Sequence, residues 1–336
     1  MSIYFFETNA QEREYISAQL PGEKIIFSEE PLTTAQQARD IGHNAEIVSV
    51  FVHSHLGPDV LDELVHLKLV VTRSTGFDHI NLPVLEGRGI PVCNVPTYGE
   101  NTVAEHTFAM ILSLSRNLHK AYSRAAAGNF STDGLQGFDL KGRTIGVVGT
   151  GHIGLHVIRI AKGFDMKVIA YDPNRNAAAA DLLGFKYTSL KELMQESDIV
   201  TLHAPLTNGN RHLIGEDNIA DFKKGALLIN TARGALVDTC ALLKALDDGI
   251  LSGAGLDVIE GENILSEEKQ LLRSSGASHE SLKMALMNRE LLRRSDLIVT
   301  PHIAFDSQEA VERILNTTIA NVKSYRAGAP ENQVHT

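Results

Sequence analysis

Short apolar runs alternate along the whole chain with stretches in which apolar residues recur at helical spacing. In the first part of the chain we expect strands at residues 2–6, 47–52 and 69–72, and a helix at 60–67. Strands that alternate with helices are typical of a parallel sheet that carries helices on its faces. This part of the chain is therefore predicted to form an α/β domain.

A second alternating series begins near residue 144. We expect a helix at 153–162 and strands at 144–148, 167–171, 199–202, 226–229, 253–256 and 297–299. An apolar helix at 102–118 and a glycine-rich connection at 128–142 precede this series, and a last helix is expected at 307–326. Two series predict two α/β domains, and the last helix can return to complete the first domain.

Composition and charge narrow the classes of protein that fit. The chain has 336 residues, of which 43% are hydrophobic and 21% charged, as in a soluble globular protein of about two domains. The net charge of −10 disfavours nucleic acid as a partner, and no apolar run approaches the roughly 20 residues of a membrane-spanning helix. The two cysteines form no CxxC motif, which predicts no disulfide framework, no metal site and a cytoplasmic location.

The segment 263–294 stands apart from the alternating pattern, because it is charged and helix-prone. We interpret it as a solvated excursion on the surface of the second domain. A flap over a site and a contact between subunits are the alternatives.

A glycine motif, GTGHIG, joins the first strand of the second series to its first helix. Gly149 permits a tight turn, Gly151 lets the backbone approach a pyrophosphate, and Gly154 lets helix and strand pack closely. The helix N-terminus, which begins with His152 and Ile153, offers unpaired N–H groups to phosphates. The motif therefore predicts a dinucleotide site.

Asp172 ends the next expected strand, eighteen residues after the third glycine. A carboxylate at about this distance bonds the ribose hydroxyls and repels a 2′-phosphate, which favours NAD over NADP. Arg175 follows closely and could serve a phosphate instead, which weakens the preference. We predict NAD as the cofactor.

Three further segments follow expected strands, at the edge where open parallel sheets bind ligands. They are NTARG at 230–234, LDVIEGE at 256–262 and TPHIA at 300–304. Arg233 offers a planar fork to a carboxylate, and His302 titrates in the range suited to proton transfer. A carboxylate beside His302 would hold its orientation, and Glu262 and Glu260 compete for this role.

In this order, the glycine motif, Asp172 and the three segments resemble the D-isomer-specific 2-hydroxyacid dehydrogenase family over nearly the whole chain. The resemblance implies that Arg233 binds and polarises the substrate, that His302 is the acid and base, and that Glu262 supports the histidine. It also implies a set of residues that contact the cofactor or shape its pocket. Besides the glycine motif and Asp172, these are His203, Pro205, Thr231, Ala232 and Asp257.

The fold that this resemblance implies has two doubly wound parallel-sheet domains. A Rossmann NAD-binding domain at 101–302 is inserted in a flavodoxin-like substrate domain, which is formed by 1–100 and 303–336. In the substrate domain, RSTGFD at 73–78 resembles the family's loop whose N–H groups hold the substrate carboxylate, through Thr75 and Gly76.

Two aromatic residues, Tyr98 and Phe305, match positions that contact substrate in the D-lactate dehydrogenase subgroup. Asp306 departs from that subgroup, which more often has an uncharged aromatic residue there, and this leaves the exact acid open. Structural or surface roles are expected for the side chains of the remaining histidines that we considered. These are His53, His79, His106 and His152.

By this resemblance the chain is expected to be an NADH-dependent enzyme that reversibly reduces a small 2-keto acid, foremost pyruvate, to the D-2-hydroxy acid. Another keto acid, such as phenylpyruvate, hydroxypyruvate or a branched-chain acid, is the first alternative. The second is a non-enzymatic NAD-sensing interaction protein. A formate dehydrogenase-like enzyme is disfavoured by Glu262, because an amide is expected there. The family also implies a homodimer, for which the helix at 102–118 could supply a two-fold interface.

Overall fold

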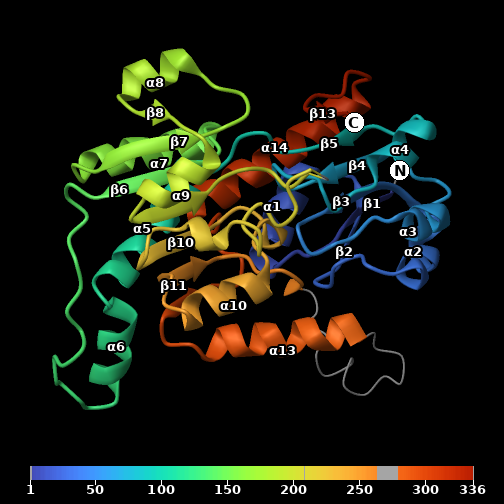
Figure 1. Ribbon diagram of the computed structural model, residues 1–336. Coiled ribbons are helices and arrows are strands. Elements are labelled where there is room, and N and C mark those ends of the chain that lie inside the picture. The colour runs from blue at the N-terminus through green and yellow to red at the C-terminus, as the bar shows by residue number, and fades with distance from the viewer. Residues whose placement is uncertain (1, 208, 263–278, 336) are drawn as a thin grey trace. The chain divides into compact units, whose positions relative to one another are not determined.

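The computed structural model describes residues 2–207, 209–262 and 279–335 (Figure 1). The chain divides into two compact units, and the second unit is inserted in the sequence of the first. The first unit consists of Met1–Tyr98 and Ser307–Thr336, and the second consists of Gly99–Asp306. Among the described residues, no helix is both long and apolar enough to cross a membrane.

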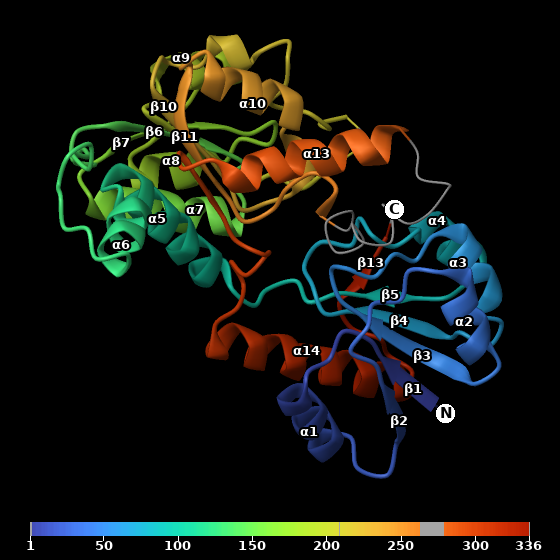
Figure 2. The ribbon, with the colours of Figure 1, turned by 90° about the horizontal axis from the view of Figure 1, so that it is seen from below.

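The first unit is built on a six-stranded sheet in the order β2-β1-β3-β4-β5-β13 (Figure 2). Its strands are Ser2–Phe5 (β1), Lys24–Phe27 (β2), Ala45–Val50 (β3), Leu69–Thr72 (β4), Val92–Cys93 (β5) and Gln333–Val334 (β13). Neighbours pair in parallel except β13, which is antiparallel to β5. The order reverses between β1 and β3, which makes this a doubly wound sheet of the flavodoxin-like type.

Helices cover both faces of this sheet, because successive strand residues point to opposite sides. In β3, Val48 contributes to the core under α2, α3 and α4, whereas Ile47 contributes to the core under α1 and α14. The helices are Ala10–Gln19 (α1), Ala35–Gly42 (α2), Pro58–Glu63 (α3), Leu82–Gly87 (α4) and Gln308–Arg326 (α14). The expected last helix is thus α14, and it returns to the first unit as predicted.

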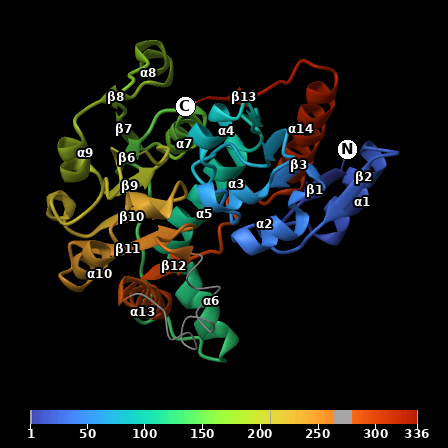
Figure 3. The ribbon, with the colours of Figure 1, turned by 90° about the vertical axis from the view of Figure 1, so that its right-hand side faces the viewer.

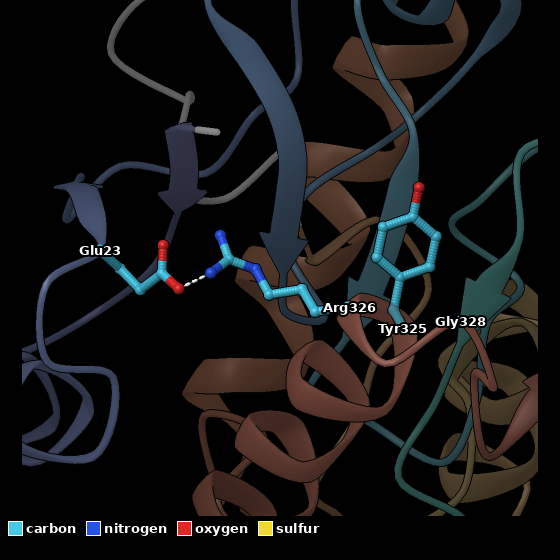
Figure 4. Close-up of a pocket in the computed structure, with 4 residues that line it drawn as sticks. All are labelled: Glu23, Tyr325, Arg326 and Gly328. Carbon is cyan, nitrogen blue, oxygen red and sulfur yellow. Dashed lines mark ion pairs between the residues drawn. The ribbon is translucent and has the colours of Figure 1, made fainter.

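The C-terminal end of α14 is joined to the turn before β2 by an ion pair between Arg326 and Glu23. Figure 4 shows this pair beside an open pocket, which is also lined by Tyr325 and Gly328. Together with Ile319 and Val322 in the core, the pair fixes this helix on its own unit.

The second unit is built on a seven-stranded parallel sheet in the order β8-β7-β6-β9-β10-β11-β12 (Figure 3). Its strands are Thr144–Val148 (β6), Lys167–Tyr171 (β7), Lys186–Tyr187 (β8), Ile199–Leu202 (β9), Ala226–Asn230 (β10), Leu251–Leu256 (β11) and Leu297–Val299 (β12). The order reverses between β6 and β9, as in a Rossmann domain. The strands expected at 144–148, 167–171, 199–202 and 297–299 are confirmed to the residue.

The helices of the second unit pack on both faces of this sheet. One core contains residues of α5, α7 and α8, and the other contains residues of α9, α10 and α13. Their bounds are Glu100–Ser115 (α5), His152–Gly163 (α7), Ala177–Leu183 (α8), Leu190–Glu196 (α9), Thr239–Asp247 (α10) and His279–Arg293 (α13). The segment expected as a surface excursion falls partly on α13, where Ala285, Asn288 and Leu291 are buried, while residues 263–278 lie outside the described residues.

The prediction of one continuous helix at 102–118 was wrong for its C-terminal residues. The helix α5 ends at Ser115, Asn117 adopts a left-handed backbone with φ of 49°, and a separate helix, Leu118–Ala126 (α6), follows. The helix ends here because the connection between α6 and β6 binds its last residue. In this contact Phe138 N donates to Ser115 O at 2.8 Å. Most apolar residues of α5 are buried within the unit, so this helix does not offer the apolar surface that the sequence suggested for a dimer.

Candidate functional site

The parallel strands of the second unit end in one row, because their last residues pair with one another across the sheet. This row consists of Tyr171, Val148, Leu202, Asn230, Leu256 and Val299. The residues that come next in the chain are Asp172, Gly149, His203, Thr231, Asp257 and Thr300. All but the last are predicted cofactor residues. Strand register alone therefore brings together residues from six distant parts of the sequence at one edge.

The glycine loop lies at the point where the strand order reverses. Gly149 has φ of 93°, and a Cβ there would lie 2.6 Å from the carbonyl oxygen of His203. A Cβ on Gly154 would lie 2.0 Å from the carbonyl oxygen of Gly149, so both positions must lack a side chain for the loop to pack. By contrast, a Cβ on Gly151 would meet no atom within 4 Å. Because Gly151 also caps the N-terminus of α7, its open side is the place where this loop can receive a phosphate group.

Asp172 is fixed to this loop by hydrogen bonds. Its Oδ2 accepts from the backbone N of Thr150 at 2.7 Å and from the Thr150 hydroxyl at 3.1 Å. The Tyr187 hydroxyl contacts the same Thr150 hydroxyl at 2.8 Å. The guanidinium of Arg175 lies over the Tyr187 ring, 5.8 Å from its centre. Asp172 is therefore the charged group that the loop itself positions. A carboxylate at this place suits the ribose hydroxyls of NAD.

His203 follows β9 on the other side of the reversal point. Desolvation by the surrounding protein lowers the pKa of His203 to about 3, so that the imidazole is neutral at physiological pH. Its Nε2 lies 2.9 Å from the Thr201 hydroxyl. Pro205, which was predicted with it, is exposed two residues further along.

The turn after β10 places Arg233. Asn230 ties this turn together, because its side chain accepts from Ala232 N at 3.0 Å and donates to Arg233 O at 2.9 Å. The hydroxyl of the buried Thr231 contacts that of Thr107 on α5 at 3.1 Å. A Cβ on Gly234 would lie 2.2 Å from the backbone of Ile259, so the turn that carries Arg233 packs directly on the segment after β11.

The two competing carboxylates of that segment point to different partners. Glu262 Oε2 lies 3.3 Å from Nδ1 of His302, and Glu262 Oε1 accepts from Ile259 N at 2.9 Å. Glu260 is buried, pairs with Arg211 and lies 2.9 Å from Nε2 of His212. The structure therefore brings Glu262, and not Glu260, to the candidate catalytic histidine.

Asp257 holds the loop on which His302 lies. Its side chain is fully buried, and its two oxygens accept from Ile303 N at 2.9 Å and from Ala304 N at 2.8 Å. The Thr300 hydroxyl also donates to it, at 2.5 Å. His302 has φ of 53°, a strained value for a residue other than glycine, and its N donates to Asp257 O at 2.9 Å. In this structure Asp257 thus acts on the histidine loop.

The remaining predicted residues are divided between the two units. The Phe305 ring lies 6.5 Å from the His302 ring, at an interplanar angle of 77°. Thr75, Gly76 and Tyr98 belong to the first unit, where Thr75 is exposed and the other two are half-buried.

Thr300, Thr150 and Tyr187 were not among the predicted site residues. Thr300 donates to Asp257 and Thr150 donates to Asp172, while Tyr187 supports the site indirectly through Thr150. Thr300 could have been found from its place next to the last strand. Tyr187 could not, because it lies on a two-residue strand that the apolar pattern does not reveal.

Comparisons with known proteins place these observations in a family. Residues 108–304 match the model of the D-isomer specific 2-hydroxyacid dehydrogenase, NAD binding domain. The chain is 34% identical to the D-lactate dehydrogenase of Escherichia coli, covering 98% of both, and 38% identical over 273 residues to the aromatic 2-oxoacid reductase of Clostridium sporogenes, covering 80% of this chain and 78% of the relative. The crystal structure of Aquifex aeolicus D-lactate dehydrogenase complexed with NAD and lactic acid matches with a TM-score of 0.86 at 37% identity, covering 97% of this chain and 96% of that one.

Proposed function

Because the chain belongs to the D-isomer-specific 2-hydroxyacid dehydrogenase family, we propose that it reduces pyruvate to D-lactate with NADH, and reversibly so. The contact between Glu262 and His302 supports it most directly, since it lies on the sheet edge that carries the glycine loop.

The residues at this edge fit NAD. The open side of Gly151 leaves room for a pyrophosphate, the N-terminus of α7 favours negative charge, and Asp172 suits the ribose hydroxyls. When bound, NADH supplies the hydride that is transferred to the keto carbon. The imidazole of His203, at the same sheet edge, is neutral and therefore adds no positive charge to the proposed cofactor site.

The proton comes from this chain. In our proposal, protonated His302 donates to the carbonyl oxygen of the substrate, and neutral His302 takes the proton back in the reverse direction. Glu262 orients the imidazole through Nδ1 and offsets its charge. Arg233 binds the substrate carboxylate with its planar fork and stabilises the charge that develops on the carbonyl oxygen.

The keto acid is proposed to be small, with Tyr98 and Phe305 as the residues that meet its side chain. The E. coli relative is named for D-lactate and the C. sporogenes relative for aromatic 2-oxoacids, at similar identity, so an aromatic keto acid is the competing substrate. The aromatic rings of Tyr98 and Phe305 suit either a methyl group or a stacked phenyl ring.

A panel of keto acids tests the proposal. NADH oxidation should be fastest, in kcat/KM, with pyruvate among pyruvate, hydroxypyruvate, phenylpyruvate and a branched-chain keto acid, and NADPH should be a much poorer donor. A preference for phenylpyruvate would move the assignment to the aromatic class. NADH binding without turnover of any keto acid would instead support the NAD-sensing alternative.

We also propose that two copies of the chain associate through α6. None of the residues of this helix is buried, and Leu118, Tyr122 and the nearby Phe130 are 58%, 74% and 82% exposed. Such apolar exposure is typical of an interface. Light scattering should give the mass of a dimer, and Tyr122→Glu should reduce it to that of a monomer. A wild-type monomer at assay concentration would contradict the proposal.

A further inference from the structure

The loop Ser74–Gly76 of the first unit contains two successive backbone N–H donors, those of Thr75 and Gly76. Within the part of the chain that the structure describes, the N–H groups of Thr75 and Gly76 donate to no acceptor. Thr75 is exposed and Gly76 is half-buried, so this loop lies at the surface, where a ligand can approach it. Two successive backbone N–H groups without an acceptor can donate to an anion such as a carboxylate.

The inner side of the same loop is fixed by the segment after β5. Val95 N donates to Ser74 O at 3.1 Å, and the side-chain amide of Asn94 donates to Thr75 O at 2.8 Å. A carbonyl and the following N–H lie in one rigid peptide plane. Bonding the carbonyl of Ser74 therefore aims the N–H of Thr75, and bonding the carbonyl of Thr75 aims the N–H of Gly76.

Asn94 is in turn held by two asparagines from the other end of the chain. Asn321, on α14, donates through Nδ2 to Asn94 O at 2.8 Å and accepts through Oδ1 from Asn332 Nδ2 at 2.8 Å. The ring closes because Asn94 N donates to Asn332 O at 3.1 Å. Asn321 is fully buried and Asn94 is 7% exposed. Buried polar networks in which each polar group finds a partner are rigid and specify one arrangement.

We propose that Asn321 and Asn332 are positioning residues for the substrate carboxylate, acting through Asn94 on the Thr75–Gly76 peptide. This inference rests on the proposed function and on the resemblance of this loop to the family's loop whose N–H groups hold the substrate carboxylate, which in our proposal Arg233 also binds. The network couples the C-terminal helix and Asn332 to the orientation of two N–H groups that are more than two hundred residues away in the sequence. The orientation of these N–H groups then depends on α14 and on Asn332, the residue before β13, as much as on the loop's own residues.

The variant Asn321→Leu tests this inference, because it removes both side-chain bonds at similar volume. We expect kcat/KM for pyruvate to fall about tenfold or more, since small displacements of positioning groups are costly in rate. Inhibition by oxamate, a carboxylate isostere of pyruvate, should weaken in parallel. The KM for NADH should stay unchanged, a separation that a general loss of folding would not produce.

The matched control is Thr318→Val, on the same helix. Thr318 is fully buried like Asn321, but its hydroxyl has no hydrogen-bond partner among the described residues, so its removal should leave every constant unchanged.

If Asn321→Leu does not fold, Asn332→Ala removes the outer bond at a half-buried position and should show the same separation to a smaller degree. Unchanged pyruvate and oxamate constants in a folded variant would overturn the inference alone. A wild-type protein that neither turns over a keto acid nor binds oxamate would overturn the proposed function with it.

Discussion

The two units have the same kind of sheet but use its reversal point differently. In the first unit the order reverses between β1 and β3, and side chains fill this place. Glu7 accepts from the N–H groups of Phe51, His53 and Ser54 at 2.9–3.1 Å. Arg73, which is only 2% exposed, donates to Phe6 O at 2.6 Å and to Glu7 O at 2.8 Å.

In the second unit the order reverses between β6 and β9, and this place is lined by glycine. Gly149 packs against the carbonyl of His203, while the side of Gly151 stays open. In both units topology sets where the strand order reverses, and the size of the side chains at that point decides whether a ligand can bind there. The first unit closes its crevice with a guanidinium and a carboxylate, and its candidate carboxylate loop follows β4 instead.

The largest effect that this comparison predicts is on the stability of the first unit. Arg73→Met should lower the free energy of unfolding by about 2–4 kcal/mol, because Phe6 O, Glu7 O and Ser49 Oγ lose a buried donor. Chemical denaturation measures the loss, and NADH affinity should not change. The control is Arg39→Met, which breaks an exposed pair with Glu63 and should hardly move the midpoint. Equal effects of the two substitutions would show that Arg73 does not hold the reversal point.

The next effect concerns the open reversal point. Gly151→Val should weaken NADH binding about tenfold or more without lowering the melting temperature, since its Cβ meets no protein atom but blocks the approach of a phosphate. Gly154→Ala should do the opposite and destabilise the fold by about 1–3 kcal/mol, because its Cβ would overlap the Gly149 carbonyl. Titration of NADH fluorescence and thermal unfolding distinguish them. Normal NADH affinity in Gly151→Val would place the cofactor elsewhere.

A smaller effect separates the two carboxylates after β11. Glu262→Gln should lower kcat about tenfold with little loss of stability, because it weakens the support of His302. Glu260→Gln should spare kcat and reduce stability, since Glu260 holds Arg211 and His212. Steady-state kinetics and urea unfolding of both variants test this, and the reverse pattern would exchange their roles.

The smallest effect is a pH dependence of stability. The pKa of His203 is about 3 in the folded chain and near 6.5 when unfolded, so the unfolded state gains a proton first as the pH falls. His203 therefore costs stability increasingly below about pH 6.5 and nothing above it. The urea midpoint of His203→Asn should fall less than that of the wild type between pH 7.5 and pH 5. A parallel fall in both proteins would contradict a neutral, desolvated His203.

Much of this architecture could be predicted from the sequence. Strands such as Leu69–Thr72 and Thr144–Val148 are buried runs bounded by polar residues, and their apolar pattern has no competing interpretation. The break after Ser115 could not be predicted, because a distant backbone N–H from Phe138 ends the helix. The short strands β5 and β8 were not predicted either, because two residues are too few to show an alternating pattern of apolar and polar positions.

The candidate site, too, could be predicted only in part from the sequence. Motif order predicted the residues that follow strand ends, and strand register brings them into one row. The supporting partners, such as Asn321 behind Asn94, depend on which side chains tertiary packing places in contact. Their sequence neighbourhood on α14 is that of an ordinary amphipathic helix.

The role of His302 as proton donor is tested by the rate of a single turnover with His302→Ala after NADH has been bound. We expect the rate of NADH oxidation by pyruvate to fall by about 10²–10⁴-fold, while the dissociation constant of NADH stays at the wild-type value. A rate close to that of the wild type would contradict the assignment of His302 as the proton donor.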